Sequence, residues 1–146
     1  MDKVDFLRGV NLFSGLKDTY LKQIAEYSVS RSYKKGETII SQGDPGIGLF
    51  IISSGKVKII KELLRGEKLE IATHGPGDFV GEMAVLDNAA RTASVVALED
   101  TECLVITAWD FKARMKAHPE IAFELLPVVV QRFRESSEML FYLSRA

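Results

Sequence analysis

The stretch of sequence that decides the fold is residues 36–81, GETIISQGDPGIGLFIISSGKVKIIKELLRGEKLEIATHGPGDFVG. It contains nine of the eleven glycines of the chain. Those at positions 36, 43, 55, 66 and 77 separate short segments that are rich in isoleucine and other strand formers. This spacing is typical of antiparallel strands joined by turns, and it predicts that the middle of the chain is all-β.

Segments within this stretch and on both sides of it have the composition of strands. We expect strands at 27–33, 37–41, 49–53, 56–62, 68–74, 92–98 and 102–107, with a short one at 78–80. Short strands at such close spacing indicate a jelly-roll or a barrel.

The two ends of the chain change to a helical pattern. Ser14 has the residue type of an N-cap, and apolar residues recur at helical spacing from there to about Tyr27. No glycine follows Gly81, and a second helical pattern runs from Trp109 to His118. Helices are therefore expected to flank the β unit on both sides.

A long helix is expected from Pro119 to Arg145, because proline suits the first turn of a helix. Pro127 removes one helical hydrogen bond, so it should kink this helix or split it near Leu126. The predicted fold class is mainly β, an antiparallel β-roll (jelly-roll) with N-terminal helices and a long C-terminal helix. A single domain, residues 1–146, would comprise N-terminal helices at 1–26, the β-roll at 27–108 and C-terminal helices at 109–146.

Composition and charge limit the classes of function. The 146 residues, of 16.2 kDa, fit one ordinary domain. The net charge of −1, from 19 basic and 20 acidic residues, offers no broad field to a nucleic acid or a membrane, so neither is expected as a partner. The one cysteine, Cys103, cannot form an internal disulfide, and no signal peptide or membrane-length apolar run is present. The expected location is the cytoplasm.

The residues that carry chemistry lie in GPGDFVGEMAVLDNAARTASV, residues 75–95. Gly81 marks a place where the backbone bends or is approached closely, and residues 82–86 have the composition of one helical turn with free N–H groups. Arg91 and Thr92 add a guanidinium and a hydroxyl, whereas Glu82 is an acceptor that needs hydroxyls or a cation. This set fits a sugar phosphate. The alternative is a surface ion pair between Glu82 and Arg91.

Two polar residues interrupt an apolar seam on the predicted C-terminal helix. Arg132 and Ser136 fall among Ala122, Leu125, Val129, Met139 and Leu143 at steps of three and four residues. A guanidinium that faces a core is costly, so Arg132 should meet a carboxylate or a bound anion. In the alternative, the helix rotates, Val130 and Phe133 face inward, and Arg132 reaches water.

The order of these elements, with GDFVGEMAVL, ARTAS and a long terminal helix, resembles the cyclic nucleotide-binding domain over nearly the whole chain. Within that superfamily the sequence is most similar to the ligand-binding half of the bacterial catabolite activator (cyclic AMP receptor) family. The resemblance implies a phosphate-binding cassette made of Gly81, Glu82, Met83, Ala84, Arg91 and Thr92. Arg91 and Thr92 would bind the cyclic phosphate, and Glu82 would bind the ribose 2′-hydroxyl.

The segment QRFRESSEML, residues 131–140, resembles the dimerisation helix of that family. By this resemblance Arg132 would approach Glu82 and the ligand, Ser136 would bind the adenine amine, and Ser137 would reach the nucleotide of a partner subunit. Ile59 and Ile71 occupy the strand positions of the purine wall, although core packing alone would also explain them. The resemblance therefore implies a homodimer formed through the C-terminal helix.

These observations predict a non-catalytic receptor with no cofactor. Its expected ligand is cyclic AMP, with cyclic GMP as the alternative, and binding should move the C-terminal helix because one ligand would contact both the cassette and that helix. The chain stops short of the helix-turn-helix that reads DNA in the activator family. Whether it is a free-standing sensor or a piece of a larger regulator stays open.

Three other functions are alternatives to a cyclic nucleotide receptor. A metal-dependent enzyme on a similar roll would need several convergent ligands, and the only histidines, His74 and His118, are expected to be surface or turn residues. A ligand-free roll that only dimerises or serves as a scaffold is the second alternative. A sensor of a different small effector is the third.

Overall fold

Two four-stranded antiparallel sheets form the body of the computed structural model, which describes residues 2–145 apart from the side chains of Met83, Ala84 and Arg145. The strands are β1 (Val29–Tyr33), β2 (Thr38–Ile40), β3 (Gly48–Ser54), β4 (Val57–Glu62), β5 (Lys68–His74), β6 (Phe79–Val80), β7 (Ser94–Ala97) and β8 (Thr101–Thr107). Their order is β1-β8-β3-β6 in one sheet and β2-β7-β4-β5 in the other. The predicted antiparallel β-roll is confirmed.

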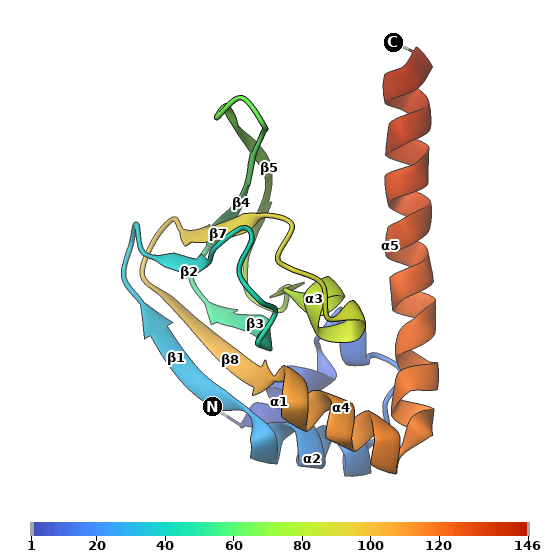
Figure 1. Cartoon of the computed structure of the whole chain (residues 1–146). Coiled ribbons are helices and arrows are strands. Elements are labelled where there is room, and N and C mark those ends of the chain that lie inside the picture. The colour runs from blue at the N-terminus through green and yellow to red at the C-terminus, as the bar shows by residue number, and fades with distance from the viewer. Residues whose placement is uncertain (1, 146) are drawn as a thin grey trace.

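The helices lie at the ends of the chain, with one short exception in the middle (Figure 1). They are α1 (Lys3–Arg8), the 3-10 turn η1 (Asn11–Phe13), α2 (Asp18–Tyr27), α3 (Glu82–Asp87), α4 (Ala108–Ala117) and α5 (Pro119–Arg145). In Figure 1 α1, α2 and α4 gather below the strands, and α5 rises from this layer along the side of the roll. No helix in the described part of the chain combines the length and apolar character needed to cross a bilayer.

Strand β3 explains why the middle of the chain is so apolar. Successive side chains of a strand point to opposite faces, and both faces of β3 are covered. Leu49 and Ile51 belong to the core under the helices, together with Leu21 of α2. Phe50 and Ile52 belong to a second core inside the roll. Because both faces are buried, this strand is a continuous apolar run and lacks the alternation of a half-exposed strand.

The N-terminal helices differ from the prediction in one respect. Ser14 is not the N-cap of α2: it ends the 3-10 turn η1, and its backbone N–H donates to Asn11. Helix α2 begins at Asp18, four residues later, and no side chain caps it. Asp18 in the first turn favours this start because its carboxylate lies near the positive end of the helix dipole.

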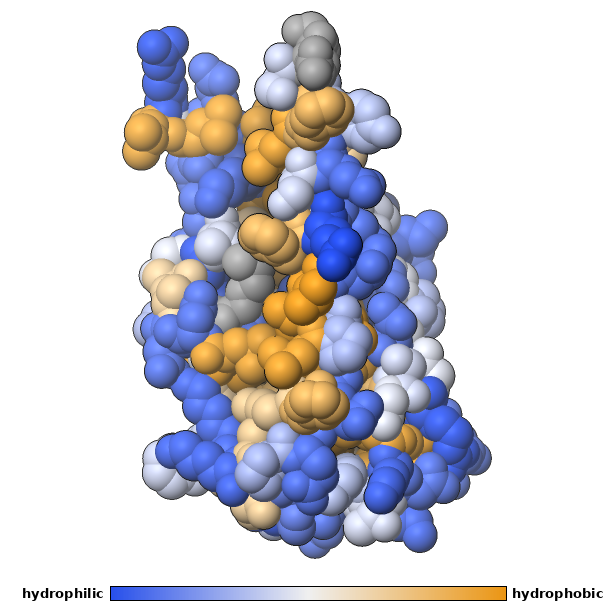
Figure 2. Space-filling view, turned by 90° about the vertical axis from the view of Figure 1, so that its right-hand side faces the viewer, coloured by the Kyte–Doolittle hydropathy of each residue, from blue (hydrophilic) through white to orange (hydrophobic). Residues whose placement is uncertain are grey.

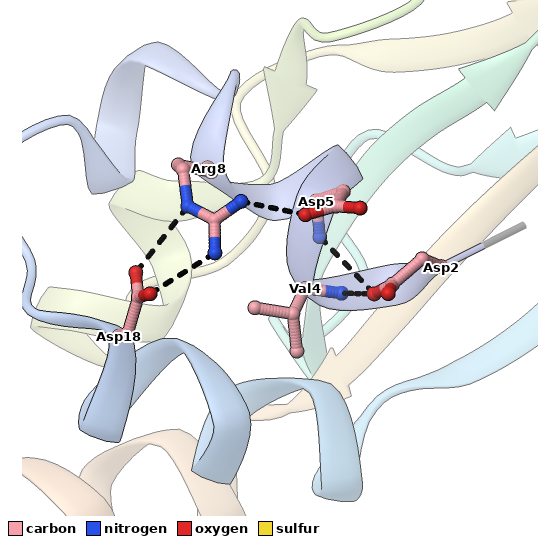
Figure 3. A network of polar contacts seen from close by, with 5 residues as sticks. All are labelled: Asp2, Val4, Asp5, Arg8 and Asp18. Carbon is pink, nitrogen blue, oxygen red and sulfur yellow. Dashed lines mark hydrogen bonds and ion pairs between the residues drawn. The ribbon is translucent and has the colours of Figure 1, made fainter.

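Asp18 also ties the first two helices together, as Figure 3 shows. Nε and Nη2 of Arg8 donate to its carboxylate at 3.3 and 3.1 Å, while Nη1 of Arg8 donates to Asp5 at 2.6 Å. Asp2 caps α1 by accepting from the backbone N–H groups of Val4 and Asp5. These contacts are exposed, so they fix the direction of the chain more than they stabilise it.

The C-terminal helix is a single helix from Pro119 to Arg145, so the expected split near Leu126 is wrong. Pro127 lies inside it. The carbonyl left without a partner belongs to Phe123, and both Phe123 and Pro127 are exposed. Water can bind a carbonyl on that side, which lowers the cost of the missing hydrogen bond.

Candidate functional site

A cavity of about 180 Å³ lies where the roll, the loop before β7 and α5 meet. Strand residues such as Ile40, Ile59 and Val95 line it together with Arg91, and α5 contributes Arg132. The segments that form it are distant in sequence. The antiparallel pairing of β4 with both β5 and β7 brings them together.

Arg91 is buried at this cavity, with only 6% of its surface exposed. Nη1 donates to the carbonyl of Gly81 at 2.7 Å, and Nη2 donates to the carbonyl of Gly48 at 2.6 Å. Among the described residues, no carboxylate forms an ion pair with it. Burial lowers the pKa of Arg91, and the more distant charge of Glu82 opposes this shift. The guanidinium thus has donors left over and no anion beside it.

The backbone around Arg91 is held from both sides. Its N–H donates to the carbonyl of Asp44 at 2.8 Å, and its carbonyl accepts from the N–H of Gly43 at 2.9 Å. Thr92 follows, exposed but still lining the cavity, and its carbonyl accepts from Lys61 Nζ at 2.6 Å. The loop that carries the guanidinium and the hydroxyl is therefore fixed by main-chain bonds.

Gly81 must be glycine for two independent reasons. Its φ of +87° lies in the left-handed region that other residues rarely adopt. A Cβ at this position would also overlap Nη1 of Arg91 and would lie 3.0 Å from the carbonyl oxygen of Gly48. The sequence prediction that the backbone is approached closely here is confirmed, and the approaching group is Arg91.

Glu82 pairs with α5 and not with Arg91. Nη1 of Arg132 donates to Oε1 of Glu82 at 2.5 Å, and the Glu82 side chain is only 15% exposed. The guanidinium carbon of Arg132 lies 3.7 Å from the centre of the Phe79 ring, a stacked arrangement that favours the cation. The sequence analysis expects Arg132 to meet a carboxylate or a bound anion. In the structure this partner is the carboxylate of Glu82, which lies 50 positions earlier in the chain. The two alternatives, a surface pair of Glu82 with Arg91 and a rotated helix, do not describe this structure.

Several predicted site residues lie in or beside the cavity, and others do not. Gly81, Glu82, Arg91, Thr92, Arg132 and Ile59 all line it. Met83 and Ala84 fall in α3, but their side chains lie outside the described part of the structure. Ile71, Ser136 and Ser137 do not line the cavity and are exposed. Ligand contacts by these last three residues stay predictions.

Ile71 has a clear local reason for its position. The register of β4 with β5 shifts between Ile59 and Ile60, and Ile71 has no cross-strand partner at that shift. It is 56% exposed, whereas its neighbour Ala72 pairs with Ile59. Successive strand residues point to opposite faces, so Ile71 lies on the face opposite to the one that Ala72 shares with the cavity residue Ile59.

The sequence prediction missed His74 as a cavity residue. His74 pairs with the fully buried Val57, whose next alternate residue is the cavity residue Ile59. Cross-strand partners share a face of the sheet, so pairing β4 with β5 in this register would have located it. Asp87, at the end of α3, was also missed, and no sequence pattern indicated it.

Comparison with known proteins gives a consistent result. A model of the family described as "Cyclic nucleotide-binding domain" matches residues 30–118. The "Cyclic AMP receptor protein" of Thermus thermophilus is 37% identical over 138 residues, covering 94% of this chain and 64% of that protein. A "cGMP-dependent protein kinase, isozyme 1" of Drosophila melanogaster is 36% identical over 114 residues, covering 76% of this chain and 15% of that protein.

The solved structures agree with the sequence relatives. The crystal structure of the Thermus thermophilus catabolite activator protein superimposes with a TM-score of 0.82 and 38% identity, covering 91% of this chain and 62% of that one. The chain spans a little under two thirds of the length of the cyclic AMP receptor relatives, at 64% and 62%.

Proposed function

The chain belongs to the cyclic nucleotide-binding domain family, and we propose that it is a non-catalytic receptor whose cavity binds cyclic AMP. A single observation carries the proposal: Arg91 is a buried guanidinium whose hydrogen bonds, within the described part of the chain, go to the neutral carbonyl oxygens of Gly81 and Gly48. A buried charge of this kind is costly unless an anion meets it. The cyclic phosphate of a nucleotide would supply one negative charge at the place where the unused N–H donors remain.

The ribose is proposed to bind Glu82. An ionised carboxylate accepts hydrogen bonds only, so it repels a phosphate but suits a sugar hydroxyl. Oε1 of Glu82 is already engaged by Arg132, which leaves the second oxygen and further lone pairs for the 2′-hydroxyl. Within the short segment 81–92, the positive charge of Arg91 would thus bind the phosphate and the negative charge of Glu82 would bind the sugar.

Preference for cyclic AMP rests on kinship and on the predicted role of Ser136. The relatives described above include a protein named for cyclic AMP and one named for cyclic GMP. The first matches 94% of this chain and the second 76%, which favours the adenine nucleotide. Ser136 lies four residues after Arg132, hence on the same side of α5. It would reach the base when α5 closes further over the cavity.

Movement of α5 is proposed as the output of binding. Arg132 is the one described residue of α5 that lines the cavity, so a ligand that contacts Glu82 or Arg132 interacts differently with docked and released forms of the helix. Coupling between two such sites is usually about 1–3 kcal/mol. The Glu82–Arg132 ion pair is therefore proposed as the link between ligand and helix.

A second copy of the chain is the proposed partner along α5. Leu126, Val130, Phe133 and Leu140 follow one another at heptad-like steps on one stripe of the helix, and all four are exposed. Figure 2 shows apolar side chains gathered in a band that runs up this side of the molecule. Ser137 falls in the same stripe, as expected for a residue that contacts the partner's nucleotide.

Titration calorimetry with cyclic AMP tests the receptor. Wild-type protein should release or absorb heat at micromolar nucleotide, and Arg91→Ala should weaken binding by roughly 30-fold or more, the value of a charge-assisted bidentate contact. Arg65→Ala, which removes an exposed arginine at the β4–β5 turn, is the control and should bind normally. Absence of binding by the wild type at millimolar cyclic AMP or cyclic GMP would favour a scaffold that only dimerises.

A further inference from the structure

Strand β4 continues past the point where β7 leaves the sheet. The backbone pairing of these two strands ends at Ile60 and Ser94, whereas β4 runs on beyond this pair. The residues just before β7 form the loop 87–93, which carries Arg91 and Thr92 and which we call the phosphate loop. On the side of β4, side chains must therefore hold this loop where strand pairing no longer does.

Lys61 makes the first of these contacts. It lies two residues after the cavity residue Ile59 on β4, so its side chain projects from the same face of the strand. Its Nζ donates to the carbonyl of Thr92 at 2.6 Å. Lys61 does not line the cavity itself. It thus joins β4 to the backbone of the residue whose hydroxyl is proposed to meet the phosphate.

Gln42 makes the second contact. Its Nε2 donates to the carbonyl of Glu62 at 3.0 Å, and its Oε1 accepts from the N–H of Glu62 at 2.8 Å. A primary amide offers a donor and an acceptor as a backbone peptide does, so Gln42 takes the place of a neighbouring strand at the end of β4. Its own N–H donates to Ser94 Oγ at 2.9 Å, and the next residue, Gly43, donates to the carbonyl of Arg91. Gln42 therefore connects β4 to the backbone of the guanidinium residue.

We propose that Lys61 and Gln42 are positioning residues, which hold the donors of the phosphate loop in the place where they meet the cyclic phosphate. This inference rests on the proposed function, and neither residue needs to touch the nucleotide. Hydrogen bonds weaken steeply when donor and acceptor are misaligned, so a loop that is free to shift would bind the same anion less well. Fixing the loop before the ligand arrives also removes the entropic cost of ordering it on binding.

The two contacts concern one part of the cavity only. Glu82, the proposed ribose partner, lies on α3 and is held by Arg132 of α5. Val95 and the other strand residues beside which the base would lie are held by the backbone pairing of β2, β4 and β7. Loss of Lys61 or Gln42 should therefore change recognition of the phosphate and leave recognition of the sugar and the base as it is.

Titration calorimetry with Lys61 variants tests the proposal. Lys61→Met keeps the aliphatic stem but removes the donor, and it should weaken cyclic AMP and cyclic GMP alike by about three- to tenfold, the worth of one hydrogen bond. Lys61→Arg can still donate to the Thr92 carbonyl and should restore most of the affinity. Lys58→Met is the matched control, because Lys58 lies on the opposite face of the same strand, where it pairs with Thr73. Gln42→Met should act in the same direction as Lys61→Met.

Two analogues of cyclic AMP, in which sulfur replaces one or the other exocyclic oxygen of the phosphate, report the position of the loop directly. Sulfur is a weaker hydrogen-bond acceptor than oxygen, so the wild type should prefer one of the two analogues. This preference should fall in Lys61→Met and in Gln42→Met and return in Lys61→Arg. Discrimination against 2′-deoxy cyclic AMP, which reports the contact with Glu82, should stay at the wild-type value in all three variants.

The outcomes separate this role from the receptor function. Affinity and sulfur preference that are unchanged in Lys61→Met would overturn the role of Lys61. A variant that loses its ribose discrimination together with its sulfur preference would show a general loosening of the cavity, which also contradicts the proposal. Thermal unfolding of each variant, which should match the wild type because the Lys61 contact is exposed, checks that the fold is intact. Failure of the wild type to bind either nucleotide would instead reject the receptor itself.

Discussion

The guanidinium of Arg91 packs directly against the backbone of Gly81. Nη1 donates to the Gly81 carbonyl at 2.7 Å, and a Cβ on Gly81 would overlap that same nitrogen. The glycine therefore does more than permit a positive φ. It leaves room for the charged group that we propose as the phosphate anchor, and it supplies a carbonyl that orients it.

Gly81→Ala should weaken cyclic AMP binding strongly, because the new methyl group displaces the guanidinium. Gly36→Ala is a matched control: its φ of +89° is nearly the same as the +87° of Gly81, but a Cβ there meets no atom within 4 Å. Both variants should lose about 1–2 kcal/mol of unfolding free energy from backbone strain. Calorimetry should show a binding defect for Gly81→Ala alone, and equal affinities for the two variants would contradict the steric role.

Glu82→Gln should weaken cyclic AMP binding by roughly tenfold, less than the loss expected for Arg91→Ala, because one charge-assisted hydrogen bond to the ribose becomes a neutral one. The comparison needs 2′-deoxy cyclic AMP as a second ligand. Wild-type protein should lose affinity for this analogue, and Glu82→Gln should discriminate much less between the two nucleotides. Undiminished discrimination by the variant would place the ribose elsewhere.

The ion pair between Glu82 and Arg132 should contribute about 1 kcal/mol to stability without ligand, as expected for a partly buried pair. A double-mutant cycle of Glu82→Gln and Arg132→Met in urea unfolding measures this coupling energy. The exposed pair of Arg8 with Asp18 provides a control cycle, which should give a smaller coupling. A zero coupling for Glu82 and Arg132 would remove the proposed link to α5.

Saturating cyclic AMP should change amide hydrogen exchange in residues 120–143, since ligand contacts bias the position of α5. Arg132→Met should reduce this change while retaining part of the affinity. Exchange in β8, which is central in its sheet, should stay the same and serves as the internal reference. Binding heat without any altered exchange in α5 would mean that the nucleotide binds but does not move the helix.

Phe133→Glu should shift the chain from dimer to monomer in sedimentation experiments, because it places a charge in the exposed apolar stripe of α5. Phe133 is 71% exposed, so the variant should fold normally. Arg134→Glu, one position further along the helix and also exposed, is the control. A wild type that is monomeric at high concentration would rule out the second copy as the partner.

The thiol of Cys103 should stay unreactive in the folded protein. Burial, with a smaller effect from Glu102, raises its pKa from an ordinary 9.0 to about 11. The folded state therefore holds the proton more tightly than the unfolded state, and stability that is complete below pH 9 should decline as the pH rises towards 11. Thiol titration should label Cys103 only on unfolding, and Cys103→Ser should flatten the loss of stability between these pH values.

The amino-acid sequence was sufficient to predict the β-roll, because turns and strands depend on the types of residues that lie close together in the chain. Glycines that must take a positive φ, such as Gly55 and Gly66, occur where the chain turns, and β-branched segments lie between them. The same locality predicted that Gly81 would be approached closely. Helix starts were harder to predict: Ser14 and Asp18 both have the residue type of a helix start, and in the structure Ser14 ends η1 whereas α2 begins at Asp18.

Most contacts between distant segments could not be derived from the residue pattern. That Arg91 contacts the carbonyls of Gly81 and Gly48 depends on how the two sheets are placed together. The contact of Arg132 with Glu82 was expected only from the family resemblance, because the pattern along the helix required a carboxylate or an anion without identifying it. The pairing of β5 with β4 places His74 opposite Val57 on the cavity side, and it places Ile71, which alternates with Ala72, on the exposed side. Turn and strand preferences act over a few residues and can be read along the chain, whereas the partner of a buried charge is chosen by three-dimensional packing over tens of residues.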